Sequence, residues 1–205
     1  LAHTMRTLGH TQWSVAVKNF AWSCTAGCLP NGYACSGGLN NLCPMCGTEE
    51  QSVYHELAEC TALRHARRWL REAASELVPE VDKESVPSFV IAGQHKAIAR
   101  KRTTLALRGC FFAQWRAQRS AAIHGQRPRS RGKIRDALNK RLRAAILRDW
   151  IRCHGQRGFE RRWRSYVEIT DGIVNIVNLP LPRKVDKPGT MHARAFRQVA
   201  GSLGD

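Results

Sequence analysis

The sequence places four potential metal ligands in one short stretch: Cys43-Pro-Met-Cys46, then His55, then Cys60. A chain that uses all four must fold back so that their sulfur and nitrogen atoms meet at one point. Gly47, directly after the second cysteine, is typical of a knuckle, a tight turn whose backbone N–H groups can donate to the sulfurs. Three thiolates and one imidazole complete a tetrahedral set that suits zinc and leaves no position for water. We therefore expect one structural Zn²⁺, which stabilises the fold because only the folded chain binds it.

Other uses of these residues fit the sequence less well. Free core cysteines beside an unrelated histidine are the plainest alternative. A deaminase-type catalytic zinc requires His-x-Glu ahead of the Pro-Cys-x-x-Cys, whereas His55 follows it. A redox CxxC would need a thioredoxin-like βαβ context, which the predicted elements do not supply. The sequence therefore indicates a structural site and no catalytic residue.

Further cysteines raise the question of a second metal site. Their spacing is irregular and lacks a knuckle glycine, so ordinary buried or exposed thiols are the alternative. Cys153-His154 has no partner nearby in sequence, and we expect a structural role for it. Because the cysteines combine with histidine at metal-ligand spacing, a reducing compartment is expected. The candidate second set is Cys24, Cys28 and Cys35, perhaps joined by His10.

The charge of the chain is concentrated in its middle. Of 205 residues, 33 are Lys or Arg and 16 are Asp or Glu, which gives a net charge of +17. Residues 1–93 carry 7 basic and 9 acidic side chains, residues 94–168 carry 21 and 4, and residues 169–205 carry 5 and 3. Such a surplus repels itself unless a polyanion neutralises it, and RNA or DNA is the obvious one. An anionic membrane surface is the other candidate, but no apolar run is long enough to span a bilayer.

Hydrophobic periodicity predicts a mainly α-helical protein. After Cys60, Thr61 as N-cap and an apolar stripe up to Leu77 indicate a helix with its arginines off that stripe. Thr170-Asp171-Gly172 between two short apolar runs indicates a C-terminal β-hairpin. The predicted organisation is a zinc module with its following helix at 1–78, a connector at 79–93, a basic helical region at 94–168, and a hairpin with an extended tail at 169–205. Within it we expect an apolar helix or strand at 15–22, helices from Gln94 to about Ile123, around 134–146 and around 159–167, and a loop from Gly125 to Gly132.

Several of these residues resemble a known family. The match includes Phe20-Ala-Trp22, Leu29-Pro30, Leu39, Cys43-Pro-Met-Cys46-Gly47, Glu49-Glu50, His55, Cys60 and Trp69, followed by Phe112-Ala-Gln-Trp115-Arg116-Ala-Gln-Arg119. Together they resemble the zinc-binding domain that follows the reverse transcriptase in non-LTR (LINE-type) retrotransposons, over roughly residues 13–125. The resemblance implies a module that engages template RNA or target DNA, with the four Cys and His residues as ligands. The chain has no Tyr-x-Asp-Asp motif and no nuclease carboxylate cluster, so polymerase activity is not expected of it.

The basic region is the expected nucleic-acid surface. Arginine greatly outnumbers lysine there, and its planar guanidinium fits phosphate oxygens in pairs. The interleaved aromatics Trp115, Trp150, Phe159 and Trp163 fall at helical spacing, which favours core packing over base stacking. An ordinary solvated face is the alternative for the charges. The candidate contacts are Arg100, Lys101, Arg102, Arg116, Arg119, Arg127, Arg129, Arg131, Lys133, Lys140, Arg141, Arg143, Arg161 and Arg162.

Three functional hypotheses follow. The first is a non-catalytic, retroelement-derived structural protein that binds RNA, expected to be ribosomal RNA, beside other proteins of a large ribonucleoprotein. The start at Leu1 rather than Met fits a processed product as well as an incomplete sequence, and we expect a mitochondrial location, with nucleus or cytoplasm as alternatives. The second is the nucleic-acid-binding C-terminal portion of a retrotransposon reverse transcriptase. The third is a zinc-containing protein-interaction module; none of the three needs a small-molecule substrate.

Overall fold

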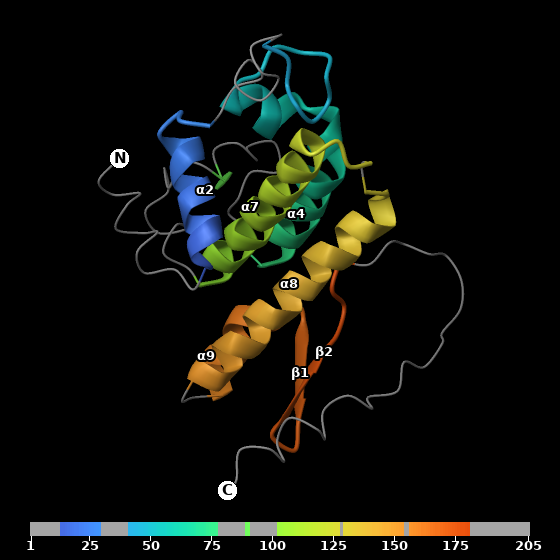
Figure 1. The fold of residues 1–205 in the computed structure, drawn as a ribbon. Coiled ribbons are helices and arrows are strands. Elements are labelled where there is room, and N and C mark those ends of the chain that lie inside the picture. Colours follow the sequence, from blue (N-terminus) through green and yellow to red (C-terminus); the bar gives the residue numbers. More distant parts are fainter. Residues whose placement is uncertain are drawn as a thin grey trace, which may run out of the picture.

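The computed structural model describes residues 13–29, 41–77, 89–90, 102–127, 129–153 and 156–180. Within these ranges the chain is mainly helical, with the Cys and His cluster near the N-terminal end and a short antiparallel hairpin near the C-terminal end (Figure 1). The predicted fold class is confirmed. Among the described helices, none combines the length and the apolar character needed to cross a bilayer.

Helix α7 (Arg102–Ile123) is the centre of the helical body. It packs against α2 (Val15–Thr25), α4 (Arg64–Leu77) and α8 (Arg131–Arg152), and α4 also contacts α8 (Figure 1). The apolar run at 15–22, for which the sequence allowed helix or strand, is helical, and the side chain of Ser14 caps it by accepting from Val17 N. The expected end of α7 at Ile123 is confirmed, whereas its expected start at Gln94 lies outside the described residues.

The helix after the metal ligands begins differently from the prediction. A five-residue π-helical turn, η1 (His55–Glu59), and a 3₁₀ turn, η2 (Thr61–Leu63), precede α4. Thr61 is therefore not an N-cap: it lies inside η2, and that turn begins after Cys60 without a side-chain cap. Arg67, expected off the apolar stripe, is instead buried and donates to the carbonyl oxygen of Cys60 at 2.9 Å. The backbone oxygen at the metal site thus supplies a partner for the guanidinium.

The loop between α7 and α8 is shorter than expected. Arg131 and Gly132 belong to α8, because Ser130 caps that helix by accepting from Lys133 N. Along α8 the predicted apolar positions Ile134, Leu138, Leu142 and Ile146 are buried. The predicted fourth helix is present as α9 (Gln156–Trp163), but it begins and ends earlier than expected, and Val167 belongs to the first strand of the hairpin.

The hairpin is confirmed. Strands β1 (Val167–Thr170) and β2 (Ile173–Ile176) pair antiparallel, with Val167 opposite Ile176 and Thr170 opposite Ile173. The turn residues Asp171 and Gly172 have φ values of 52° and 75°. Positive φ at both central positions is the type I′ geometry, which matches the twist of the flanking strands and explains why Asp-Gly is found there.

One apolar core runs through regions that the charge pattern separates. It extends from Val17 on α2 to Leu179 beyond β2, and includes Trp115, Phe159 and Trp163 as fully buried side chains. Across this core, Trp69 Nε1 of α4 donates to Asn139 Oδ1 of α8 at 2.8 Å. Of the predicted connector at residues 79–93, Phe89 and Val90 are described, and Val90 is buried in this core. The division of the chain that follows the charge pattern stays a prediction.

Candidate metal centre

The CxxC segment forms a short, hydrogen-bonded turn. Leu42 and Glu50 pair as an isolated antiparallel bridge, Cys43 N donates to Glu49 O at 2.7 Å, and Gly47 N donates to Cys43 O at 2.8 Å. Gly47 has a φ of +70°, a left-handed conformation that side-chain-bearing residues rarely adopt. The predicted knuckle is therefore present, and the backbone conformation at position 47 explains why a glycine stands there.

The π-helical turn η1 brings the other two ligands to the same point. Cys60 N donates to His55 O at 2.7 Å, an i to i+5 bond that places residues five apart on one side of the turn. The start of the turn is fixed by Ser52, whose hydroxyl oxygen accepts from His55 N at 2.9 Å. The spacing of four residues between His55 and Cys60 thus has a local structural basis.

The four ligand atoms have the separations that a tetrahedral metal site requires. They all lie within 4.8 Å of one another. The Cys43 and Cys60 sulfurs are 3.9 Å apart, and Cys46 Sγ is 3.4 Å from His55 Nε2. Zinc bound tetrahedrally at its usual distances would separate two sulfurs by about 3.8 Å and a sulfur from a nitrogen by about 3.6 Å. Cys43, Cys46, His55 and Cys60 therefore fit one metal ion, and their donor set is the one that zinc prefers.

Burial and charge at this cluster also favour a cation. Cys43 and Cys60 are fully buried and His55 nearly so, whereas Cys46 is half-buried. Contact with Cys60 raises the pKa of the Cys43 thiol well above its usual range, while the same contact lowers the pKa of Cys60. Burial alone would raise the pKa of Cys46, but the Thr48 hydroxyl and the backbone N–H groups of Thr48 and Glu49 lower it. A bound dication would remove the protons from these neighbouring thiols and convert them to thiolates.

Glu59 orients the imidazole ligand. Its Oε2 lies 3.6 Å from His55 Nδ1, on the side of the ring opposite Cys46. A carboxylate on this side of the ring favours the tautomer that carries its proton on Nδ1 and leaves Nε2 free to bind a metal. Glu59 was not among the residues expected at the site, although its position four residues after His55 on a helical turn was the available signal.

Glu56 connects the metal centre to α7. Its carboxylate is completely buried, accepts from Trp115 Nε1 at 2.7 Å, and forms an ion pair with Arg119 Nε at 3.3 Å. Burial raises the pKa of Glu56, and the opposing influence of Arg119 and Trp115 lessens this rise. Because Glu56 immediately follows His55, these contacts hold the ligand segment against the central helix. This role could not be expected from the sequence, since Glu56 lies 59 residues before Trp115 in the chain.

The predicted nucleic-acid contacts do not form one uniform surface. Arg119 is buried against Glu56, so its guanidinium faces the interior instead of solvent. Arg141 is half-buried and donates to Gln114 Oε1 at 3.1 Å. Arg162 Nε donates to Asp149 Oδ2 at 3.0 Å. Arg100 and Lys101 lie outside the described residues. The exposed members are Arg102, Arg116, Arg127, Arg129, Arg131, Lys133, Lys140, Arg143 and Arg161.

The described residues give no support to the second metal site expected from the sequence. Cys24 is buried in the core, where burial raises its pKa, and Cys28 is exposed; Cys35 and His10 lie outside the described ranges. Among the residues that the structure describes, the cluster at residues 43–60 is the one group suited to a metal. Cys153 lies against the Arg162 guanidinium, and its neighbour His154 is outside the described part.

Comparisons of the chain with family models, with curated proteins and with solved structures find no match.

Proposed function

We propose that this chain is a non-catalytic, zinc-containing RNA-binding protein, of retroelement origin, that serves as a structural component of a large ribonucleoprotein such as a mitochondrial ribosome. The observation that carries the proposal is the separation of two features: a buried, closed Cys₃His cluster and an exposed basic face on α8. A closed site has no position for a substrate or water, so its contribution is to stability. Binding is then left to the exposed cations.

The basic face supports RNA binding through its position as well as its charge. Arg127, Arg129, Arg131 and Lys133 are exposed where α7 gives way to α8, and Lys140 and Arg143 follow along α8. Acidic side chains are sparse there, because residues 94–168 contain only four. Guanidinium groups on a rigid helix can bind successive phosphates with little loss of side-chain entropy. This arrangement suits a folded RNA, which is held through its backbone.

The alternative is the nucleic-acid-binding C-terminal region of a non-LTR retrotransposon reverse transcriptase. One observation supports it: α2 and α7, two of the segments that carry the resemblance, pack together, with Phe20 and Trp115 in edge-to-face contact at 5.3 Å. The two proposals differ in gene organisation. A native transcript that encodes a polymerase upstream of Leu1 would favour the alternative, and one that does not would favour the first proposal.

RNA binding is tested by reversing exposed charge in the basic region. The triple variant Arg127→Glu, Arg129→Glu and Arg131→Glu should lose most of its salt-sensitive affinity for RNA, because the charges that release counterions are removed. The matched control reverses three exposed arginines of α4, Arg64→Glu, Arg68→Glu and Arg71→Glu, with the same change in net charge. Affinity is measured by filter binding at several salt concentrations, and zinc content confirms that both proteins are folded.

Equal losses in the two triple variants would show that only net charge matters and would contradict the assignment to residues 94–168. Binding that does not respond to salt would favour the third hypothesis, a protein-interaction module.

A further inference from the structure

A groove lies between α7 and α8, and residues at the start of α2 form part of its wall. It has a volume of about 640 Å³, within the range of about 300–1,000 Å³ that is usual for ligand sites. The groove exists because the facing helix surfaces carry small residues at helical spacing, so the backbones leave room between them. These residues are Ala106, Gly109 and Ala113 on α7, with Ala144 and Ala145 on α8.

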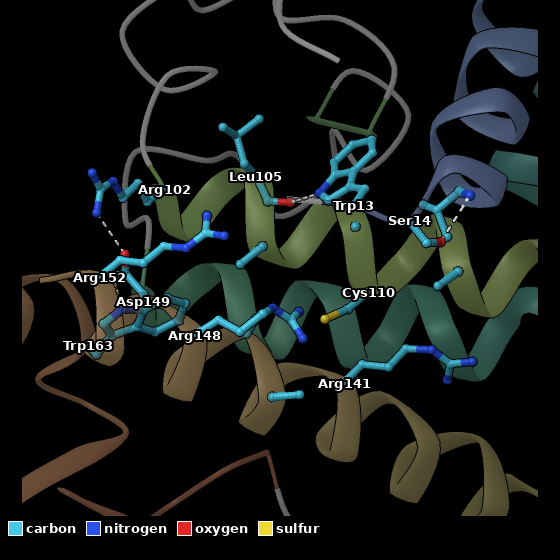
Figure 2. Close-up of a pocket in the computed structure, with 16 residues that line it drawn as sticks. Trp13, Ser14, Arg102, Leu105, Cys110, Arg141, Arg148, Asp149, Arg152 and Trp163 are labelled. Atoms are coloured by element: carbon cyan, nitrogen blue, oxygen red, sulfur yellow. Dashed lines mark hydrogen bonds and ion pairs between the residues drawn. The ribbon is translucent and has the colours of Figure 1, made fainter. Parts of the chain in front are cut away.

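Three arginines line the groove from one face of α8. Arg141, Arg148 and Arg152 are seven and four residues apart, which places them on the same side of the helix, and Arg141 and Arg148 extend toward α7 (Figure 2). Arg148 and Arg152 are exposed, and no carboxylate in the described ranges lies within ion-pair distance of either. The groove therefore presents guanidinium groups that a ligand could neutralise.

The carboxylate in the groove wall does not cancel this charge. Asp149 accepts from Arg102 Nη1 at 2.9 Å, from Arg162 Nε at 3.0 Å and from Trp163 Nε1 at 2.9 Å. Burial would raise the pKa of Asp149, but these donors more than offset it and hold the pKa below its usual value. Because two arginines already neutralise Asp149, Arg148 and Arg152 remain a net positive pair.

The remaining wall is aromatic and apolar. Trp13 lies against Gly109, where its ring occupies the space that a β-carbon would need, and its Nε1 donates to Leu105 O at 2.9 Å. That hydrogen bond fixes the half-buried indole at the edge of the groove beside the small residues of the floor. An aromatic wall and an apolar floor next to guanidinium groups are the combination that holds single-stranded nucleic acid.

We propose that this groove binds an unpaired nucleotide of an RNA strand, with its base beside Trp13 on the apolar floor and the adjoining phosphates on Arg148 and Arg152. The inference rests on the proposed function and adds to it a location and a preference for single strands. A continuous duplex keeps its bases stacked inside, so it could offer phosphates to these arginines but no base to the floor.

The test uses the full chain and two labelled RNA probes of about 12 nucleotides, an oligouridylate and a blunt duplex. Arg148→Ala with Arg152→Ala should weaken oligouridylate binding by about tenfold or more, and should lower the salt slope by about 1.4, since each phosphate contact on a single strand contributes about 0.7. The matched control is Lys140→Ala with Arg143→Ala, which removes the same charge from exposed positions of α8 outside the groove. We expect a smaller loss from the control pair.

A second variant tests whether RNA binding needs the open space of the groove, and leaves the charge of the groove unchanged. Ala145→Phe fills the floor and leaves every arginine in place, so it should weaken oligouridylate binding while duplex binding stays unchanged. Cross-linking of 4-thiouridine RNA to the unmodified protein gives a readout that does not depend on any variant folding: the cross-linked peptides should come from residues 13–17, 102–113 and 141–152.

Equal losses in the two double variants, or cross-links confined to other segments, would overturn the groove proposal and leave the proposed function intact. Duplex RNA bound as tightly as oligouridylate would also overturn it. If the unmodified protein binds neither probe at any salt concentration, the proposed function fails as well.

Discussion

At the scale of single residues, the metal centre depends on side chains in two layers. Cys43, Cys46, His55 and Cys60 supply the candidate ligand atoms, and the Glu59 carboxylate lies 3.6 Å from the outer nitrogen of the imidazole. Glu56, next to His55 in sequence, turns the other way and enters the core. Adjacent residues on one turn therefore serve the metal and the packing separately.

Replacing a ligand should remove the metal. Cys43→Ser or Cys60→Ser should lose the bound zinc and destabilise residues 43–77 strongly, because structural zinc contributes about 10–16 kcal/mol of binding free energy in small domains. Cys28→Ser is the matched control, since Cys28 is exposed and lies outside the cluster. Metal analysis of the purified proteins checks this, and full zinc content in either ligand variant would contradict the ligand assignment.

Arg119 should be required for stability. Arg119→Met leaves the buried Glu56 carboxylate without its ion-pair partner, and breaking a buried pair from one side costs about 3–5 kcal/mol. Arg116→Met is the control, because Arg116 lies on the same helix but is exposed, and its replacement should change the stability by less than about 0.5 kcal/mol. Urea unfolding at neutral pH measures both free energies of unfolding. Similar values for the two variants would mean that the Glu56–Arg119 pair adds nothing to stability.

At the scale of elements, α2 is held to α7 through a close approach. Trp13, just before α2, packs where Gly109 has no side chain, and its ring also contacts Phe112 at a centroid distance of 5.7 Å. From the sequence, Gly109 is expected only to weaken the middle of its helix. The structure shows that the missing β-carbon is what permits the contact.

Two glycine-to-alanine changes should have opposite effects. In Gly109→Ala the new β-carbon would overlap the Trp13 ring at Nε1, so the indole must move, and we expect the protein to lose about 1–3 kcal/mol of stability. In Gly132→Ala the β-carbon meets nothing within 4 Å, and the better helix propensity of alanine should stabilise α8 by up to about 1 kcal/mol. Thermal unfolding of both variants shows whether each substitution raises or lowers the stability. A stabilised Gly109→Ala protein would show that Trp13 does not pack there.

At the scale of the whole molecule, the metal centre and the basic helices are joined through one core. Helix α7 contacts α2, α4, α8 and α9, and Glu56 links the ligand segment to it directly. The basic face of α8 therefore belongs to the same packed body as the cluster, and a metal bound there would stabilise both. Removal of a bound metal should weaken the proposed RNA binding only indirectly, because it would loosen the packing of α4 and α7.

Chelation of the metal should loosen the molecule unevenly. Treatment with EDTA should increase amide hydrogen exchange most in residues 43–77, where the ligands and α4 lie, and less in residues 156–176, which hold α9 and the hairpin. Locally stabilised segments exchange through local opening, so the affected region reports where the metal acts. Hydrogen exchange with mass spectrometry measures the difference. An equal increase in both segments would show that the metal is required for the whole fold.

The sequence by itself determined the features that short-range spacing encodes. The four ligands, the knuckle glycine, the apolar stripe of α8 and the Asp-Gly turn of the hairpin are each specified within a few residues, since helix period, strand alternation and backbone sterics act locally. Only the tertiary structure decided which face of each helix is covered. It placed Arg119 in the core and left Arg148 and Arg152 beside a groove, because burial depends on the packing partner and not on the residue type.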